Sequence, residues 1–222
     1  MASLPIRRRI AGPLFVALMT AGLTAGRADA QAAAKKDYTP ADADFMQMMI
    51  MHHAQAVVMS DWAATHGARS DVLVLCQRIA LSQRDEITLM QHWLEARGLS
   101  APDPLRMNTP HAGPVVDSSP MHMPGMDMGP DPMLMDGMLT PAQMRALDAA
   151  RGVAFDRLYL TGMIKHHEGA LKMVAALFAT PGGGQQPELS GYAADIDAGQ
   201  RAEIGRMQAM LQTLPTSTSP TR

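Results

Sequence analysis

Four stretches of the chain repeat apolar residues at intervals of three and four positions, with a histidine or glutamine within each series. Residues at this spacing share one face of an α-helix, and such stripes are typical of the buried side of helices in a bundle. The pattern therefore predicts four helices that pack against one another. The stripes are Phe45, Met49, His52, Ala56, Met59 and Ala63; Cys76, Ala80, Gln83, Ile87, Met90 and Leu94; Tyr159, Met163, His166, Ala170, Met173 and Leu177; and Ile196, Gln200, Ile204, Met207 and Leu211.

Start and stop signals for helices bracket these stretches. A threonine followed by a proline precedes the first stretch at Thr39 and the third at Thr140, as is typical of an N-cap with proline in the first turn. Gln143 completes a capping-box pattern with Thr140. Gly152 is expected to break or kink the third helix near its start. The expected stop signals are Gly67, Gly98, the run 181–184 and Pro215.

The stretches are two copies of one unit. The pattern Met-Ile-x-His-His-x-x-Ala-x-x-Met occurs at 49–59 and again at 163–173, 114 residues later. The pattern Gln-Arg-x-Glu-Ile-x-x-Met-Gln-x-x-Leu occurs at 83–94 and at 200–211, 117 residues later. Two similar helical hairpins predict an all-α fold, an antiparallel four-helix bundle with a pseudo-two-fold axis.

The predicted domain is residues 31–222, with hairpin one at 40–98 and hairpin two at 140–214. The linker between them, 100–139, is rich in proline and glycine, which disfavour helices and strands. A long irregular segment inside a compact domain is usually functional or disordered. The linker is therefore expected to be an irregular, Met-rich connection.

The first 30 residues have the composition of a secretory signal peptide. A basic run at 7–9 precedes an apolar run at 10–25, and Ala28-Asp29-Ala30 fits an A-x-A cleavage pattern. The apolar run is short for a bilayer crossing, although an uncleaved N-terminal anchor is the alternative. We expect an exported protein, periplasmic or secreted after cleavage near Ala30, with no membrane span in the mature chain.

Charge and cysteine content narrow the function classes. The formal net charge is −2 and no basic block follows the signal peptide, which makes nucleic acid an unexpected partner. The single cysteine, Cys76, cannot form an internal disulfide and is interpreted as a small buried apolar residue. The unusual residue is methionine, with 21 copies beside 8 histidines.

The paired histidines are the first candidate metal ligands. Neighbouring residues on a helix point about 100° apart, so His52 lies on the apolar stripe and His53 at its edge. Met49 lies one turn before both, and thus joins a thioether to two imidazoles on one surface. The equivalent residues of the second repeat are His166, His167 and Met163.

The partner helices supply further candidates. A carboxylate or amide beside an imidazole N–H would fix its tautomer and direct the other nitrogen at a metal. Soft thioethers favour Cu(I) and Ag(I), and imidazole suits copper. For one histidine pair, packing in the core would be the better explanation, but repetition of the whole pattern favours a metal site. The additional candidate ligands are Met90 and Met207, and the candidate orienting residues are Gln83, Glu86, Gln200 and Glu203.

The linker is an independent candidate. It holds seven methionines between positions 121 and 138, at M-x-M and M-x-x-M spacings that let thioethers of a flexible chain converge on one soft ion. Packing of these methionines over the bundle is the alternative, but the polar, Pro- and Gly-rich flanks make a poor core segment. The linker candidates are Met121, His122, Met123, Met126 and Met128.

Other motifs are weaker. The Glu-x-x-His signature of di-iron helical bundles does not occur in the chain. Asp42, Asp44 and Asp156 are interpreted as first-turn carboxylates that the helix dipole favours. His66 and His92 have no counterpart in the other repeat.

The two His-His segments and the two Gln-Arg-x-Glu-Ile segments resemble a secreted bacterial family known as domain of unknown function 305. The resemblance covers about residues 40–213, apart from much of the linker. It implies a ferritin-like four-helix bundle, and some members of the family are periplasmic copper-binding proteins linked to copper tolerance. The family's histidine positions correspond to His52, His53, His166 and His167.

The sequence therefore predicts an exported protein that sequesters or shuttles copper, with Cu(I) preferred and Ag(I) or Cu(II) as alternatives, and without catalytic turnover. An envelope copper exporter or oxidase is the kind of protein partner this predicts. Two other hypotheses stay open: a ferritin-like oxidase with a His/Glu centre, and a structural or partner-binding bundle without metal.

Overall fold

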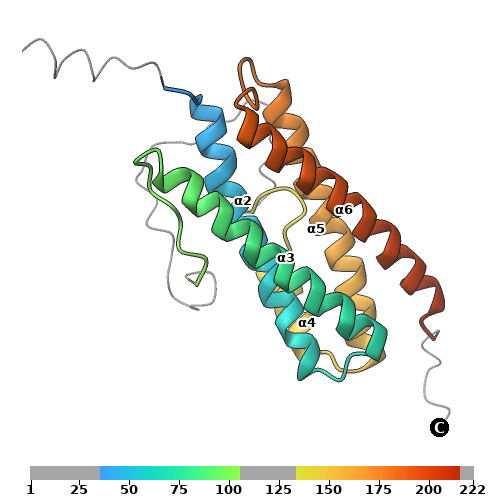
Figure 1. Cartoon of the computed structure of the whole chain (residues 1–222). Coiled ribbons are helices and arrows are strands. Elements are labelled where there is room, and N and C mark those ends of the chain that lie inside the picture. The colour runs from blue at the N-terminus through green and yellow to red at the C-terminus, as the bar shows by residue number, and fades with distance from the viewer. Residues whose placement is uncertain (1–35, 106–133, 216–222) are drawn as a thin grey trace, which may run out of the picture. The chain divides into compact units, whose positions relative to one another are not determined.

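The computed structural model describes residues 36–105 and 134–215, and within these ranges it contains helices and no strands. The predicted all-α class is confirmed, whereas the ferritin-like grouping stays a prediction. The predicted signal peptide lies outside the described residues. Within these ranges, every helix is too short or too polar to span a lipid bilayer. In chain order the helices are α2 (Pro40–Asp61), the short 3-10 helix η1 (Trp62–Ala64), α3 (Ser70–Glu95), α4 (Pro141–Ala149), α5 (Val153–Ala179) and α6 (Pro187–Thr213) (Figure 1).

Local sequence sets the helix boundaries. Thr39 caps α2 in a capping box with Asp42, and Thr140 caps α4 in a capping box with Gln143, each followed by proline at the first helical position. The predicted break falls at Gly152, whose φ of 56° lies in the left-handed region that glycine tolerates best. The stretch expected to form one third helix is therefore two helices, α4 and α5.

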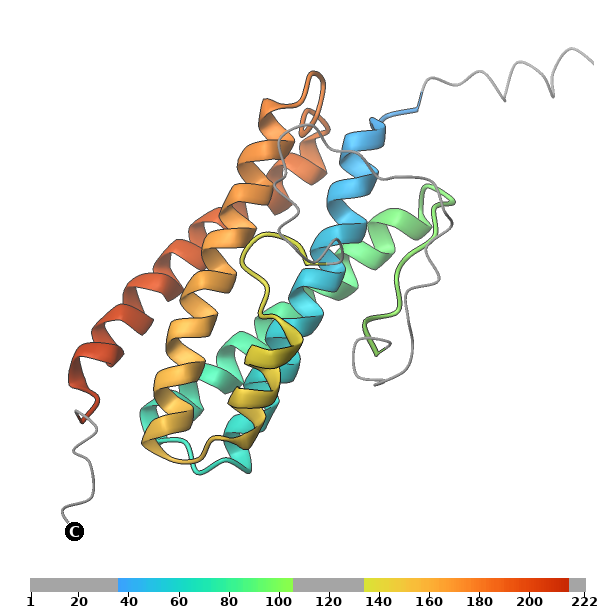
Figure 2. The same ribbon diagram turned by 180° about the vertical axis from the view of Figure 1, so that it is seen from behind.

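The long helices form two hairpins. Helices α2 and α3 pack along each other, α5 and α6 do the same, and α2 packs against α5 to join the hairpins. Figure 1 shows α3 and α6 on the viewer's side, and the reverse view in Figure 2 shows α2 and α5 in front of them. The helices α2 and α5 thus form the main helix–helix contact between the two repeats.

The interior has two apolar parts with a polar layer between them. Halfway along each long helix the buried residues change from apolar to polar and back again. The first core cluster includes Phe45, Met49, Ile50, Ile87, Met90, Trp93, Met173, Leu177, Leu189 and Ile196. The second core cluster includes Ala56, Met59, Leu75, Cys76, Ile79, Phe155, Tyr159, Met163 and Met207. The polar layer consists of His52, His53, Gln83, Glu86, His166, His167, Gln200 and Glu203.

Two buried aspartates tie the hairpins together. Asp42, at the start of α2, accepts a hydrogen bond from the backbone N–H of Gly184 in the α5–α6 loop at 2.7 Å. Asp156, its repeat equivalent at the start of α5, accepts from the backbone N–H of Arg69 in the α2–α3 loop at 3.2 Å. Each carboxylate therefore holds the loop of the other hairpin, a reciprocal clasp that goes beyond the predicted dipole effect.

Removing either carboxylate of this clasp is expected to destabilise the fold. Asp42→Ala leaves the buried N–H of Gly184 without its acceptor, and Asp156→Ala does the same to the partly buried N–H of Arg69. Such a loss costs about 1–3 kcal/mol of unfolding free energy, and the cost should be nearer the lower end for Asp156→Ala. Urea denaturation followed by far-UV circular dichroism measures the change. The matched control is Asp85→Ala on α3, an exposed aspartate whose loss should change stability by no more than about 0.5 kcal/mol. Clasp variants as stable as this control would show that the clasp contributes nothing.

Candidate metal centre

The two histidine pairs meet where α2 packs against α5. His52 and His53 come from α2, His166 and His167 from α5, and all four side chains are fully buried at 0% exposure. The rings of His52 and His166 lie 3.8 Å apart between centroids at an interplanar angle of 40°. The sequence left open whether the pairs form one site or two, and the structure brings them together at one place.

The second histidine of each pair contacts a glutamate of its own hairpin. His53 Nε2 lies 2.6 Å from Glu86 Oε2 on α3, and His167 Nε2 lies 2.7 Å from Glu203 Oε2 on α6. Burial acts to raise the pKa of Glu86, but the hydrogen bond from His53 and the charges nearby outweigh it and lower that pKa. Glu86 is therefore a carboxylate that accepts from Nε2–H, which leaves Nδ1 of His53 as the nitrogen free to bind a metal.

Several polar atoms of this layer have no hydrogen-bond partner among the described residues. They are Nδ1 of all four histidines, Nε2 of His166, Oε1 of Gln83, and both amide atoms of Gln200. A buried polar atom without a partner costs about 1–3 kcal/mol, so such a concentration is a liability for the fold alone. A cation bound among the imidazole nitrogens would offset that cost.

The two central imidazoles are neutral at physiological pH. Burial, followed by the charge of His53, lowers the pKa of His52 to about 3. Burial, followed by the charges of His52 and His167, lowers the pKa of His166 well below its usual range. A neutral imidazole carries a lone pair, which is the form that binds metal ions.

The end of the linker also reaches this layer. His52 Nε2 lies 3.0 Å from the main-chain oxygen of Asp136, and a carbonyl can only accept, so Nε2 carries the proton. The side chain of Gln55 binds both the N–H and the C=O of Leu139, at 2.7 and 3.0 Å. Neither Asp136 nor Gln55 was among the sequence candidates. Every residue has a main-chain carbonyl, so the sequence does not indicate which one contacts a histidine. Gln55 lies two residues after the histidine pair but belongs to no repeated pattern.

The predicted methionines of the bundle lie on both sides of the polar layer. Met49 and Met90 belong to the first core cluster, and Met163 and Met207 belong to the second. Each is at most 1% exposed. The linker candidates Met121, His122, Met123, Met126 and Met128 lie outside the described residues.

The donor set fits a soft ion of low coordination number. Across residues 36–105 and 134–215, no three His, Cys, Asp or Glu side chains are already arranged to hold a metal ion. The structure does bring His52 and His166 together, and both rings keep nitrogens without a hydrogen-bond partner among these residues. The thioethers of Met49 and Met163 lie one helical turn before the histidines of their own helices. Imidazole with thioether is a ligand chemistry that suits copper, and Cu(I) in particular.

Other polar groups of the sequence play no part in this layer. His66 is buried at the end of the first hairpin, with Nε2 2.8 Å from the main-chain oxygen of Asp148, and His92 is exposed on α3. Cys76 is buried in the second core cluster, as expected of a small apolar residue, and burial raises its pKa to about 12.

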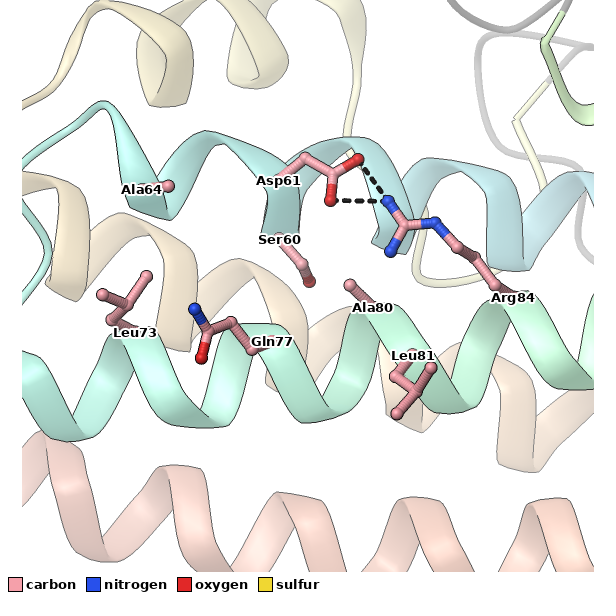
Figure 3. Close-up of a pocket in the computed structure, with 8 residues that line it drawn as sticks. All are labelled: Ser60, Asp61, Ala64, Leu73, Gln77, Ala80, Leu81 and Arg84. Carbon is pink, nitrogen blue, oxygen red and sulfur yellow. Dashed lines mark hydrogen bonds and ion pairs between the residues drawn. The ribbon is translucent and has the colours of Figure 1, made fainter.

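A surface pocket between α2 and α3 is also separate from the histidines. Its lining includes Ser60, Leu73, Gln77 and Leu81, and Arg84 forms an ion pair with Asp61 at 2.6 Å along its side (Figure 3). Neither histidine nor methionine lines it. This pocket offers no ligand for a soft metal.

Comparisons with known proteins agree with this helical architecture. A family model described as Domain of unknown function (DUF305) matches residues 42–211. A comparison with curated proteins gives no match.

Three solved structures align over most of the chain. A DUF305 fragment from Deinococcus radiodurans is 26% identical, with a TM-score of 0.62, and the alignment covers 80% of this chain and 99% of that one. A DUF305 protein from Streptomyces coelicolor is 28% identical, with a TM-score of 0.61 and coverage of 79% and 93%. CopM in its Cu(II)-bound form is 28% identical, with a TM-score of 0.53 and coverage of 77% and 95%.

Proposed function

This chain belongs to the family described as domain of unknown function DUF305, and from that premise we propose that it is an exported copper-binding protein. It binds Cu(I) in preference to Ag(I) and Cu(II), and it sequesters or shuttles copper in the cell envelope as part of metal tolerance. No catalytic turnover is required for this function.

The observation that carries the proposal is the buried His52–His166 pair. Two neutral imidazoles whose centroids lie 3.8 Å apart keep nitrogens without a hydrogen-bond partner among the described residues, in a polar layer between two apolar core clusters. A fold gains nothing from such an arrangement unless a ligand satisfies it. His52, His53, His166 and His167 are the proposed imidazole ligands.

Copper is favoured over other metals by the residues around the histidines. Met49, Met90, Met163 and Met207 bring soft thioethers to the layer from both core clusters. Cys76 is a buried thiol rather than an available thiolate. CopM, which is 28% identical to this chain, has been solved with Cu(II) bound, and this agrees with a copper site in a related fold.

We further propose that the linker captures ions and the bundle holds them. Met121, His122, Met123, Met126 and Met128 stand within eight positions of one another. Thioethers at such spacing bind soft ions without a prearranged cavity. A protein partner that supplies or removes copper would meet the chain at this segment.

A Cu(I) competition titration tests the function. Residues 31–222 are titrated under reducing, anaerobic conditions against a chromophoric chelator, and uptake of at least one equivalent is expected. A variant with Met121, Met123, Met126 and Met128 replaced by leucine keeps the apolar bulk and separates linker sites from bundle sites. It should lose the linker's share of the copper and keep the bundle's share. No uptake against a weak chelator would remove the copper proposal.

An oxidase is the second candidate, because Glu86 and Glu203 lie beside the histidines. Carboxylates with imidazoles are also the ligands of di-iron centres in helical bundles. Iron loading with an absorption band of a coupled di-metal centre, together with oxygen consumption, would favour this alternative. A colourless Cu(I) complex without turnover would oppose it. If the protein folds tightly but binds no metal in preference to another, the third hypothesis is favoured, in which the helices have a structural or partner-binding role.

A further inference from the structure

The end of the linker is docked onto the bundle beside the histidines. We define the docked segment as residues 135–139, whose last two members, Met138 and Leu139, are 5% and 4% exposed. The side chain of Gln55 on α2 holds Leu139 through both of its main-chain polar groups. On the outer side, Lys172 Nζ lies 3.4 Å from Asp136 Oδ1. The segment therefore contacts both α2 and α5.

This docking depends on a glycine in α5. A Cβ at Gly169 would overlap the carbonyl oxygen of Asp136 and would lie 2.7 Å from the Cα of Gly137. Gly137 in turn has a φ of 81°, and a Cβ there would lie 2.5 Å from the carbonyl oxygen of Lys165. These are contacts with backbone, which cannot move aside as a flexible side chain could. The close approach of the docked segment to α5 thus requires glycine on both sides.

The docked segment breaks the symmetry of the two repeats at one place. The carbonyl oxygen of Asp136 accepts the Nε2 hydrogen of His52, but no main-chain oxygen of the docked segment is bonded to its repeat equivalent, His166, and neither nitrogen of that ring has a hydrogen-bond partner within residues 36–105 and 134–215. His53 and His167 are oriented by glutamates on neighbouring helices. His52 is therefore oriented by a loop. His53 and His167 are instead oriented by glutamates of their own hairpins.

We propose that the docked segment is part of the metal centre: the Asp136 carbonyl positions His52 so that Nδ1 faces the metal, and Gly169 makes this docking possible. The inference rests on the proposed function and adds that metal binding and linker docking are coupled. A contact that orients a ligand raises metal affinity. By linkage, the bound metal strengthens the docking by the same factor. Gly169 and Asp136 are positioning residues and do not themselves bind the ion.

The test compares Gly169→Ala with Gly191→Ala. Both positions are helical glycines, but a Cβ at Gly191 meets nothing within 4 Å, so the control adds the same methyl group without touching the docked segment. In the metal-free protein, long-range ¹⁵N spectra of the imidazoles report the tautomer of His52. The wild type and Gly191→Ala should show it fixed with the proton on Nε2, and Gly169→Ala should lose that fixed tautomer. Hydrogen exchange at the Leu139 amide reports whether the segment is docked.

The Cu(I) affinity is then measured for the same variants. Gly169→Ala is expected to bind about 10- to 100-fold more weakly than the wild type, and Gly191→Ala is expected to match the wild type. Copper should also slow exchange of the Leu139 amide in the wild type. Faster exchange in Gly169→Ala with an unchanged His52 tautomer and unchanged affinity would mean that the docked segment only packs, and would overturn the inference.

Two further arms keep the test decisive. If Gly169→Ala does not fold, Gln55→Leu removes the hydrogen bonds to Leu139 from the other side and should give the same losses. If the wild type takes up no Cu(I), the proposed function fails by itself. The ¹⁵N spectra of the metal-free protein still judge the positioning of His52, because they need no metal. An unfixed His52 in the wild type overturns the positioning role.

Discussion

Replacing His52 and His166 together by leucine is expected to lower the Cu(I) affinity of the bundle by more than about 100-fold, since loss of mere orienting contacts already costs 10- to 100-fold. Both rings supply unpartnered nitrogens at the contact between α2 and α5. Leucine removes these nitrogens and keeps a buried side chain of comparable size. The linker's share of the copper should be unaffected, so the variant is best measured in the background that lacks the linker methionines.

The same substitution is expected to leave the metal-free protein as stable as the wild type, or to stabilise it. Apolar replacement of buried polar groups is often neutral or favourable, because it removes their desolvation cost. One cost remains, since the carbonyl of Asp136 loses the hydrogen bond from His52. Urea denaturation in the presence of a copper chelator measures the balance.

The control for this pair is His92→Leu, an exposed histidine on α3 that should change neither affinity nor stability. Unchanged Cu(I) affinity in the double variant would place the copper site elsewhere. A loss of more than about 3 kcal/mol of unfolding free energy would show that the histidines stabilise the bundle as packed side chains, beyond the usual cost of one buried polar group. A variant that loses Cu(I) affinity but keeps its unfolding free energy would show that His52 and His166 serve metal binding rather than stability.

Glu86→Gln and Glu203→Gln are each expected to lower Cu(I) affinity by about 10- to 100-fold. Glutamine keeps the size of the side chain and an oxygen that can accept from Nε2–H. It removes the charge that makes His53 or His167 a better electron donor through Nδ1. Because the two contacts measure 2.6 and 2.7 Å in the two repeats, the two substitutions should have similar effects.

The matched control for these variants is Glu168→Gln. Glu168 follows His167 directly on α5 but is exposed, so its loss removes a nearby negative charge without touching an imidazole. Affinity should change little, and less at higher salt, because exposed charges are screened. If the three substitutions weaken binding equally, general electrostatic attraction accounts for the effect, and the orienting role of Glu86 and Glu203 is wrong.

Much of this fold could be predicted because the relevant signals are local. Thr39 and Thr140 mark helix starts through their own side chains, and Gly152 breaks the third helix through its own backbone freedom. The repeat also suggested that a glutamate on the neighbouring helix accompanies each histidine pair, since residues 83–94 and 200–211 match. These inferences need only spacing along one hairpin.

The contact between hairpins could not be predicted in the same way. His52 and His166 lie 114 residues apart, and helical periodicity assigns each to a buried face without saying which buried face it meets. The Asp136 carbonyl could not be predicted because every residue has a main-chain carbonyl, and only the tertiary structure places this one beside His52. Gly169 carries no sequence signal of its own, because the need for glycine arises from the backbone that the docked segment places against α5.

The reciprocal clasp has a consequence for the order of folding during synthesis. Hairpin one emerges first, but the loop between α2 and α3 is held by Asp156, which belongs to the hairpin made last. Asp42 of hairpin one likewise accepts its hydrogen bond from the backbone N–H of Gly184, which belongs to hairpin two. In either hairpin alone these groups have no protein partner, so we expect the early half to be an incomplete folding unit and the native structure to form only when both halves are present.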